Sequence, residues 1–552
     1  MTARPFRAQR NQSWMTRAFT VVAAVVITIC IIPYVGVLAA AASGSFDTLA
    51  HLADTVLGRY TVTTLLLVAI VMVGTAVIGA GSAWLVTMTE FPGRRWFEIA
   101  LALPLAFPAY VLAYAYTHIL DHPGIVQATL RDVTGWGPRD YWFPEIRSLG
   151  GAAMMLTLVL YPYVYLLARA AFSAQGASTF LAARVLGKSP LGAFFLVSLP
   201  MARPAIAAGV ILVAMETIAD FGTVAYFGVQ TFAVGIYTSW IALADRAAAA
   251  QLALGLLAFA LFLAMLERYS RGDASYANGR RGVPMARITL NRTQKMGAVA
   301  FCLFPILFGV VFPVVALGTM AFGSEQDLLS PRYIGFIRNS LTLASIAAIV
   351  TVTAALVLGT LHRVHNNRAS SAALYLARIG YAVPGGVIAV GLLVPFAAFD
   401  NGLDAWMRAN FDISTGLLFT GSVWLLTFAY LIRFLAAALG AYESGIASVG
   451  TNMDAAARTL GQNMPGMVRR IHLPLMRTSL LTAGLIVFVD VMKELPATLI
   501  MRPFNYDTLA VQAYRLASDE RLEGAAVPSL VLAAIGLIPV VLLCRRIGKG
   551  RA

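Results

Sequence analysis

Long apolar runs, separated by short polar segments, set the pattern along this 552-residue chain. A helix needs about 20 predominantly apolar residues to cross the hydrocarbon layer of a membrane. Twelve runs reach that length, at about residues 19–42, 61–88, 97–117, 150–172, 204–227, 247–266, 296–322, 340–361, 373–399, 416–438, 478–501 and 526–544. The run at 373–399 is the weakest because it contains Arg378. The pattern predicts an all-α integral membrane protein with about 12 transmembrane helices, and it requires no strand.

Composition excludes a soluble globular protein. Hydrophobic residues make up 59% of the chain and charged residues 12%, and the mean hydropathy is +0.76. A typical soluble domain is about half apolar and about a quarter charged. So large an apolar excess is typical of a chain that is embedded in lipid.

The first apolar run imitates a secretory signal peptide. It follows four arginines and ends near the small residues AAAASGS at 39–45. Its apolar core is longer than the roughly 7–15 residues of a signal peptide. We therefore interpret it as an uncleaved membrane anchor.

The distribution of charge indicates the orientation of the chain. An even number of spans places both termini on one side of the membrane. With the N-terminus in the cytoplasm, most of the 41 Lys and Arg residues fall in cytoplasmic segments, as is usual for membrane proteins. The net charge of +15 therefore reflects topology, and the scattered basic residues predict no nucleic-acid partner.

Residues that carry metal or catalytic chemistry are few and dispersed. The cysteines Cys30, Cys302 and Cys544 lie in or beside separate apolar runs, so we interpret them as small apolar fillers. The six histidines form no cluster in the predicted topology: His51, His118, His122, His362, His365 and His472. No nucleophile stands beside a positioned base. We expect no catalytic residue, no metal site and no cofactor.

The chain contains an internal duplication. The stretch AARVLGKSPLGAFFLVSLP at 182–200 returns as AARTLGQNMPGMVRRIHLP at 456–474, an offset of 274 residues, and Pro108 matches Pro384 at an offset of 276. A nearly constant offset through separated segments is typical of a repeat. We predict a first half at 1–266, a basic cytoplasmic linker at 267–295 and a second half at 296–552. Six spans in each half make the repeats parallel.

The repeated stretch raises the question of a nucleotide site. Gly187, Lys188 and Ser189 look like the end of a phosphate-binding loop, but Ala182 occupies the place of its first glycine and no strand precedes it. The residues instead predict a helix, a glycine turn and a second short helix. Ser189 and Asn463 are placed to cap the second helix in the two copies. A helical elbow without a partner is the alternative interpretation.

Both copies resemble the EAA loop of permeases from binding-protein-dependent ABC importers. The pattern is two alanines, a glycine, and a Leu-Pro ending, within loops at 176–203 and 450–477. The resemblance implies that each loop contacts a cytoplasmic ATPase subunit, so that the chain itself is not an enzyme. The implied coupling residues are Ala182, Ala183, Arg184, Gly187, Leu199, Pro200, Ala456, Ala457, Arg458, Gly461, Leu473 and Pro474.

The sequence departs from the EAA pattern in one respect. The leading glutamate is replaced by Leu181 in the first copy and by Ala455 in the second, with Asp454 displaced by one position. An acidic contact therefore cannot be transferred from the family. Arg184 and Arg458 are our candidates for charged contacts.

Longer sequence segments after each loop narrow the resemblance to one group of importers. ETIADFGTVAYFGVQTFAVGIY from Glu216 and KELPATLIMRPFNYDTLAVQAYRLASDERLEGAA from Lys493 are similar to the fused two-half permeases of ferric-iron importers. This implies a type I importer with the MetI-like fold in a bacterial inner membrane, working with ATP-binding subunits in two copies and a periplasmic substrate-binding protein. That protein would dock on the outer face, where Arg59, Arg139, Arg338 and Arg515 are candidate contacts.

Other functions stay open at this point. Phosphonate, thiamine and polyamine importers share the architecture. An ion-coupled secondary transporter of twelve spans is the alternative from another class, although the loop EFPGRRWFE lacks most of the acidic-basic signature expected there. A membrane scaffold without transport would explain neither repeated loop.

Four acidic residues lie in predicted spans: Glu216, Asp220, Asp490 and Glu494. Each pair is four residues apart, which would place its members on one helix face. Charges at mid-membrane are costly, so lipid-facing positions are excluded. Either Lys493, Arg378 or Arg433 neutralises the acids within the bundle, or the acids line the translocation path and offer oxygen ligands to a trivalent cation.

Overall fold

The computed structural model describes residues 5–44, 46–175, 185–271, 287–324, 326–327 and 330–549. Eleven of its helices are long and apolar enough to cross a membrane. The bent pair Arg94–Ala106 and Ala109–Thr134, whose arms meet at 90°, makes a twelfth span if it is counted as one. The predicted all-α membrane protein with about 12 spans is confirmed.

The chain folds into two compact units, and each draws on both halves of the sequence. Unit 1 contains residues 1–49, 239–257 and 329–508, and unit 2 contains residues 50–238, 258–328 and 509–552. Neither unit coincides with a predicted half, because segments are exchanged. The helices α2 (Phe46–Leu52), η4 (Thr238–Ala242) and α13 (Arg246–Arg271) have residues in both units.

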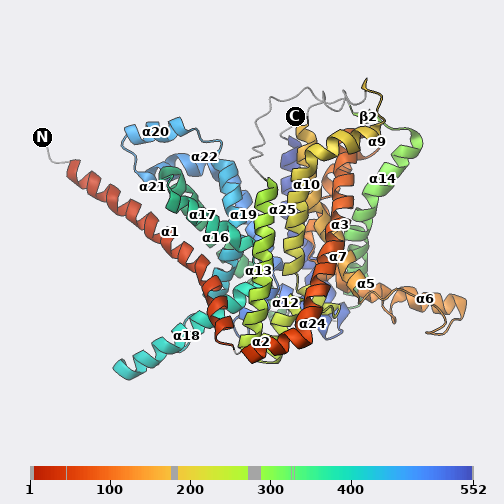
Figure 1. The fold of residues 1–552 in the computed structure, drawn as a ribbon, viewed down its shortest axis with the longest axis horizontal. Coiled ribbons are helices and arrows are strands. Elements are labelled where there is room, and N and C mark those ends of the chain that lie inside the picture. Colours follow the sequence, from red (N-terminus) through yellow and green to blue (C-terminus); the bar gives the residue numbers. More distant parts are fainter. Residues whose placement is uncertain are drawn as a thin grey trace. The chain divides into compact units, whose positions relative to one another are not determined.

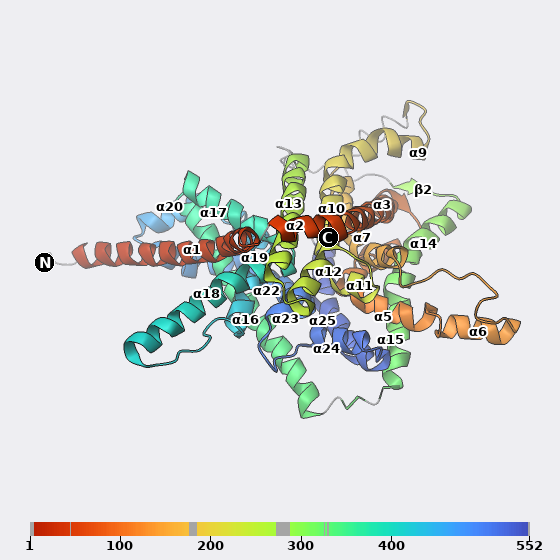
Figure 2. The same ribbon diagram turned by 60° about the horizontal axis from the view of Figure 1, so that its bottom comes forward.

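Unit 1 packs the first helix of the chain against helices from its second half (Figure 1). Its elements are α1 (Pro5–Ala42), α16 (Pro331–Val364), α17 (Arg368–Ile379), η6 (Gly380–Ala382), α18 (Gly385–Phe411), α19 (Val423–Ile446), α20 (Thr451–Thr459), α21 (Met464–Met467), η7 (Val468–His472), α22 (Leu473–Lys493) and α23 (Pro496–Met501). Figure 2 shows α1 running beside α17 and α18. The crossing of α1 and α18 is close because Gly36 faces Gly391 and has no Cβ to separate the backbones.

Unit 2 is built around α3 (Gly58–Met88), α7 (Leu149–Ala174) and α10 (Leu199–Ala219). Its other elements are η1 (Ala53–Leu57), β1 (Thr89–Glu90), α4 (Arg94–Ala100), η2 (Leu103–Ala106), α5 (Ala109–Leu120), α6 (Ile125–Thr134), α9 (Pro190–Ala193), η3 (Phe194–Ser198), α11 (Gly222–Tyr226), α12 (Phe232–Tyr237), β2 (Ile288–Thr289), α14 (Arg292–Ile306), η5 (Leu307–Val311), α15 (Phe312–Phe322), α24 (Leu509–Ser518) and α25 (Leu522–Lys549).

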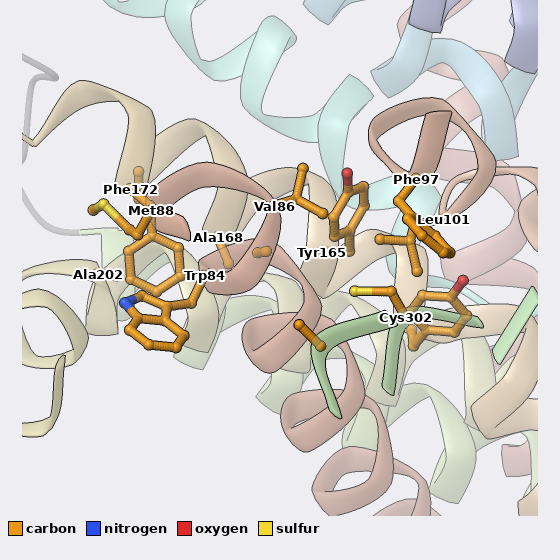
Figure 3. Packing of buried hydrophobic residues seen from close by; sticks show 14 of the residues in the cluster. Trp84, Val86, Met88, Phe97, Leu101, Tyr165, Ala168, Phe172, Ala202 and Cys302 are labelled. Carbon is orange, nitrogen blue, oxygen red and sulfur yellow. The ribbon is translucent and has the colours of Figure 1, made fainter. Parts of the chain in front are cut away.

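A buried cluster shows how α14 joins unit 2 (Figure 3). Trp84 of α3, Phe172 of α7 and Ala202 of α10 meet at one side of the cluster, and Cys302 of α14 lies among aromatic rings at the other. Cys30 and Cys302 are both free and buried, which confirms their interpretation as apolar fillers. The side chain of Cys544 lies outside the described residues.

Two predicted spans are broken at matching prolines. Pro108 precedes α5 and Pro384 precedes α18, and the residue before each proline is extended. A proline disfavours the helical conformation at the residue before it. The run predicted at 373–399 is therefore not one helix, and Arg378 lies in the short helix α17, ahead of the break.

Four further expectations need correction. The run predicted at 416–438 becomes helical only from Val423. The runs at 204–227 and 478–501 end as helices at Ala219 and Lys493, earlier than expected. Two-residue strands also form, because Ile288 and Thr289, within the predicted linker, pair in parallel with the two residues that follow α3, with Thr89 opposite Ile288.

Candidate coupling loops and intramembrane acids

The second loop has the helix, glycine turn and capped helix that its sequence predicts. The helix α20 ends at Thr459, and Gly461 then adopts the left-handed backbone conformation with φ +73°. Oδ1 of Asn463 accepts a hydrogen bond of 2.9 Å from the backbone N of Gly466, which caps α21. The π-helical segment η7 follows, and Leu473 and Pro474 begin the long helix α22.

The first loop repeats this order of elements wherever it is described. Gly187 has φ +79°, and Oγ of Ser189 accepts a hydrogen bond of 3.0 Å from the backbone N of Gly192 in α9. The segment η3 follows, and Leu199 and Pro200 begin α10. The predicted caps are confirmed in both copies. Ala182, Ala183 and Arg184 lie outside the described residues.

Exposure separates the loop residues that can meet a partner from those that support the loop. Ala456 and Arg458 are exposed, whereas Ala457 is buried. Leu186 and Leu460, which are aligned in the repeat and directly precede the two glycines, are each 79% exposed. Our sequence reasoning missed these leucines. Their signal was present, since a large apolar residue occupies the same loop position in both copies.

Asp454 does not face outward as a substitute for the missing glutamate. It is 6% exposed. Its Oδ2 accepts a hydrogen bond of 2.5 Å from Arg363 Nε, and its Oδ1 lies 2.9 Å from His472 Nε2. Burial alone would raise the pKa of Asp454, but the hydrogen bonds from His472 and Arg363 outweigh it and lower that pKa below its usual value of 3.8. The carboxylate is thus held in its charged form.

The intramembrane acids at the ends of α10 and α22 share one local role. Asp220 and Glu494 follow the last helical residues and have extended backbones. Asp220 Oδ1 accepts from Thr223 N at 3.1 Å, and Glu494 Oε2 accepts from Thr498 N at 3.1 Å. Each carboxylate therefore caps the short helix that follows, α11 or α23. The expectation that each acidic pair lies on one face of a continuous helix is wrong, because both helices end between its members.

Basic side chains accompany the acids of α22 and α23. Lys493 Nζ lies 3.1 Å from Asp490 Oδ1, and Arg433 NH1 lies 3.8 Å from Glu494 Oε1. Arg378, the third predicted neutraliser, pairs with Glu443 instead. A Cβ at Gly385 would lie 2.5 Å from Glu494 Oε1, so any larger residue there would displace the carboxylate. These contacts favour the structural interpretation for Asp490 and Glu494.

Comparison with known proteins gives one consistent picture. The chain is 25% identical to the "Fe(3+)-transport system permease protein FbpB 2" of Haemophilus influenzae over 87% of this chain and 88% of that protein. It is 25% identical to the "Probable ABC transporter permease protein y4fN" of Sinorhizobium fredii over 100% and 99% of the two chains. No protein-family model matches.

The resemblance to ABC-transporter permeases is confirmed. A shorter match, 27% identical over 35% of the chain and 68% of the relative, is to the "Putative 2-aminoethylphosphonate transport system permease protein PhnU" of Salmonella choleraesuis. The chain is accordingly a multi-pass membrane protein that is similar to ABC-transporter permeases, and such relatives imply ATP-binding and substrate-binding partners.

The described part of the chain contains no group of three or more His, Cys, Asp and Glu side chains that could hold a metal ion. His118 lies in the last turn of α5 and His122 in the loop after it, so the two do not share a helix face. The candidate docking residues Arg59, Arg139, Arg338 and Arg515 are all exposed. Their role in docking stays a prediction.

Sequence reasoning also missed an arginine in the loop between α6 and α7. Arg147 donates two hydrogen bonds, of 2.7 and 2.8 Å, to the carboxylate of Glu520 and one of 2.8 Å to Asp121. The hydrogen bond to Glu520 raises the pKa of Arg147 further. No local sequence signal could have paired residues 373 positions apart.

Proposed function

We propose that the permease carries ferric iron, delivered by a periplasmic substrate-binding protein, across a bacterial inner membrane, with ATP hydrolysed by two copies of a separate cytoplasmic subunit. Both termini and both repeated loops would lie in the cytoplasm. The observation that carries the proposal is the pair of loops with the same order of elements, each presenting an exposed leucine before a left-handed glycine. The ferric-iron relative supports the choice of substrate.

Two loops of this kind suit a partner that acts as a pair. Each exposed leucine, Leu186 or Leu460, would insert into an apolar groove of one ATPase subunit, and the exposed Arg458 would add a charged contact. Closure of the ATPase pair would then move the long helices α10 and α22, which begin at the ends of the loops. Such movement changes access to the substrate path only if the contacts differ between the two states.

The acids provide a testable link to the cargo. Trivalent iron prefers hard oxygen donors such as carboxylates. Asp220 and Glu494 are engaged as helix caps, whereas Glu216 and Asp490 lie within α10 and α22 and are aligned in the repeat. In our proposal all four influence transport. Glu216 offers a weak, transient contact that a transporter must be able to release, and Asp490 does so by exchanging its ion pair with Lys493 for the cargo.

Replacing Glu216 with Gln and Asp490 with Asn together is expected to lower ferric-iron uptake at least threefold with normal amounts of protein in the membrane. The reason is that two carboxylates would be lost while the helix caps remain. Uptake of radioactive iron into proteoliposomes, normalised to permease content, measures the effect. Neutralising all four acids without any change in uptake would reject a role for them in transport.

The substrate is decided by the binding protein that stimulates the complex. We expect a ferric-loaded binding protein to raise ATP hydrolysis in proteoliposomes severalfold, and thiamine-loaded or phosphonate-loaded proteins to leave it at the basal rate. The assay uses the permease with its ATPase subunit and each loaded protein in turn. Greater stimulation by the phosphonate-loaded protein would reassign the cargo. Uptake driven by an ion gradient with no ATPase subunit bound would instead identify a secondary transporter.

A further inference from the structure

Three charged or polar side chains meet at the base of the second loop, where Asp454 and His472 are buried and Arg363 is partly buried. Arg363, at the end of α16, donates from Nε to Asp454 and from its two terminal nitrogens to the carbonyl oxygens of Ile446 and Val449, at 3.2 and 2.6 Å. His472, which is fully buried, holds the other oxygen of Asp454. We call Arg363, Asp454 and His472 the loop clamp.

The loop clamp joins four elements of unit 1. Asp454 belongs to α20, His472 ends η7 just ahead of α22, and Arg363 belongs to α16. Of the two carbonyl oxygens that Arg363 contacts, that of Ile446 ends α19 and that of Val449 lies in the segment between α19 and α20. One guanidinium thus binds the backbone at and just beyond the end of one membrane helix together with the carboxylate of the loop helix, which its forked shape permits.

Apolar side chains pack beside the loop clamp and stabilise the same ends of the helices. Tyr442 and Val449 are buried with Met476 in one cluster, and Tyr442 Oη lies 3.3 Å from Thr360 Oγ1. The ends of α16 and α19 and the start of α22 are therefore packed together beside the loop clamp. The helix α20 is fixed to this packed base by Asp454, while Leu460 just beyond it is exposed.

The first copy has no matching charges at the described positions. Thr87 aligns with Arg363, and its hydroxyl bonds to Ala83 O within its own helix. Ser198 aligns with His472, and its carbonyl accepts from the Gln175 amide at 2.9 Å. The residue aligned with Asp454, Phe180, lies outside the described residues. The charged clamp is thus a feature of the second copy.

We propose that the loop clamp makes the second loop a rigid lever, so that displacement of α20 by an ATPase subunit is passed directly to α16, α19 and α22. The three are positioning residues and contact neither nucleotide nor cargo. The inference rests on the proposed function, because it assumes an ATPase subunit on the loop. Without the clamp, α20 would shift alone and ATP would be hydrolysed without movement of the membrane helices.

The test is the number of ferric ions transported per ATP hydrolysed, measured in proteoliposomes with the ATPase subunit and the ferric-loaded binding protein. We expect Arg363→Gln and Asp454→Asn each to lower this ratio at least threefold while the ATPase subunit still co-purifies. The double variant should lie no lower than the worse single variant, because both changes break one unit. Thr87→Val, at the aligned position of the first copy, should leave the ratio unchanged.

The histidine supplies a milder pair of variants. His472→Gln keeps an N–H that can reach Asp454, so its ratio should stay near that of the original chain, whereas His472→Ala should lower it. If Arg363→Gln does not accumulate in the membrane, the two His472 variants still test whether the loop clamp couples ATP hydrolysis to transport. An unchanged ratio in His472→Ala, or an equal fall in Thr87→Val, would overturn the proposal.

The assay also separates this proposal from the one on which it rests. If the unaltered chain binds no ATPase subunit and transports no iron, the proposed function fails and the lever fails with it. If the unaltered chain transports iron and the clamp variants only reduce the amount of protein, at an unchanged ratio, the proposed function stands and the lever does not.

Discussion

Replacing Leu186 and Leu460 together with Asp is expected to abolish co-purification of the ATPase subunit and ATP-driven uptake. Both leucines are 79% exposed, so the folded chain loses little from the change. Burying a leucine side chain contributes about 1.5–3 kcal/mol, and each 1.4 kcal/mol corresponds to about a tenfold change in affinity. Each single variant should therefore weaken binding by roughly one to two orders of magnitude, and the double variant by more.

The matched control is Tyr269→Asp. Tyr269 is 86% exposed near the end of α13 and lies outside both repeated loops. The Tyr269→Asp variant should bind the ATPase subunit as the unaltered chain does. This result would show that a new surface charge weakens binding only when it lies in a coupling loop. If the ATPase subunit co-purifies in full with the double leucine variant, the two loops do not form the coupling interface.

Replacing Gly36 with Leu is expected to destabilise unit 1 severely. A Cβ at Gly36 would overlap the carbonyl oxygen of Gly391, which is backbone and has no rotamer with which to yield. Overpacking a well-packed site costs about 1–3 kcal/mol and occasionally more, and here α1 must move away from α18. We expect a loss of about 3 kcal/mol or more, seen as a lower unfolding midpoint of the purified permease in detergent and as poor accumulation in the membrane.

Gly402→Leu provides the control for this prediction. Gly402 lies in α18 like Gly391, but nothing lies within 4 Å of a Cβ built there. The variant should unfold near the midpoint of the unaltered chain. Equal stability of Gly36→Leu and Gly402→Leu would mean that α1 does not pack on α18 as described.

The coupling loops were the part of the candidate site most accessible to sequence reasoning. Their structure is determined locally. The left-handed backbone of the turn favours glycine at position 461, Asn463 caps the helix α21, and Leu473 and Pro474 begin the helix α22. Neighbouring residues alone impose these features. The exposed leucines also lay within reach of the repeat alignment, but hydrophobicity by itself suggested burial.

The acids were harder to interpret because their partners are distant in the sequence. Spacing suggested that Asp490 and Glu494 share a helix face, yet the backbone leaves the helix at Glu494, which instead caps α23. Arg433 reaches that carboxylate from 61 positions away, and the space for both depends on Gly385. Helical periodicity carries no information on such contacts.

The sequence alone determined the membrane class, the number of spans, the duplication and the local build of the two loops, because these depend on run length, hydropathy and the conformational preferences of Gly, Pro and Asn. Only the tertiary structure decided that α1 packs with helices of the second half, that α14 packs with those of the first, and that Arg363 holds Asp454. These contacts join residues that periodicity treats as independent, and they are selected by shape and charge complementarity once the helices have formed.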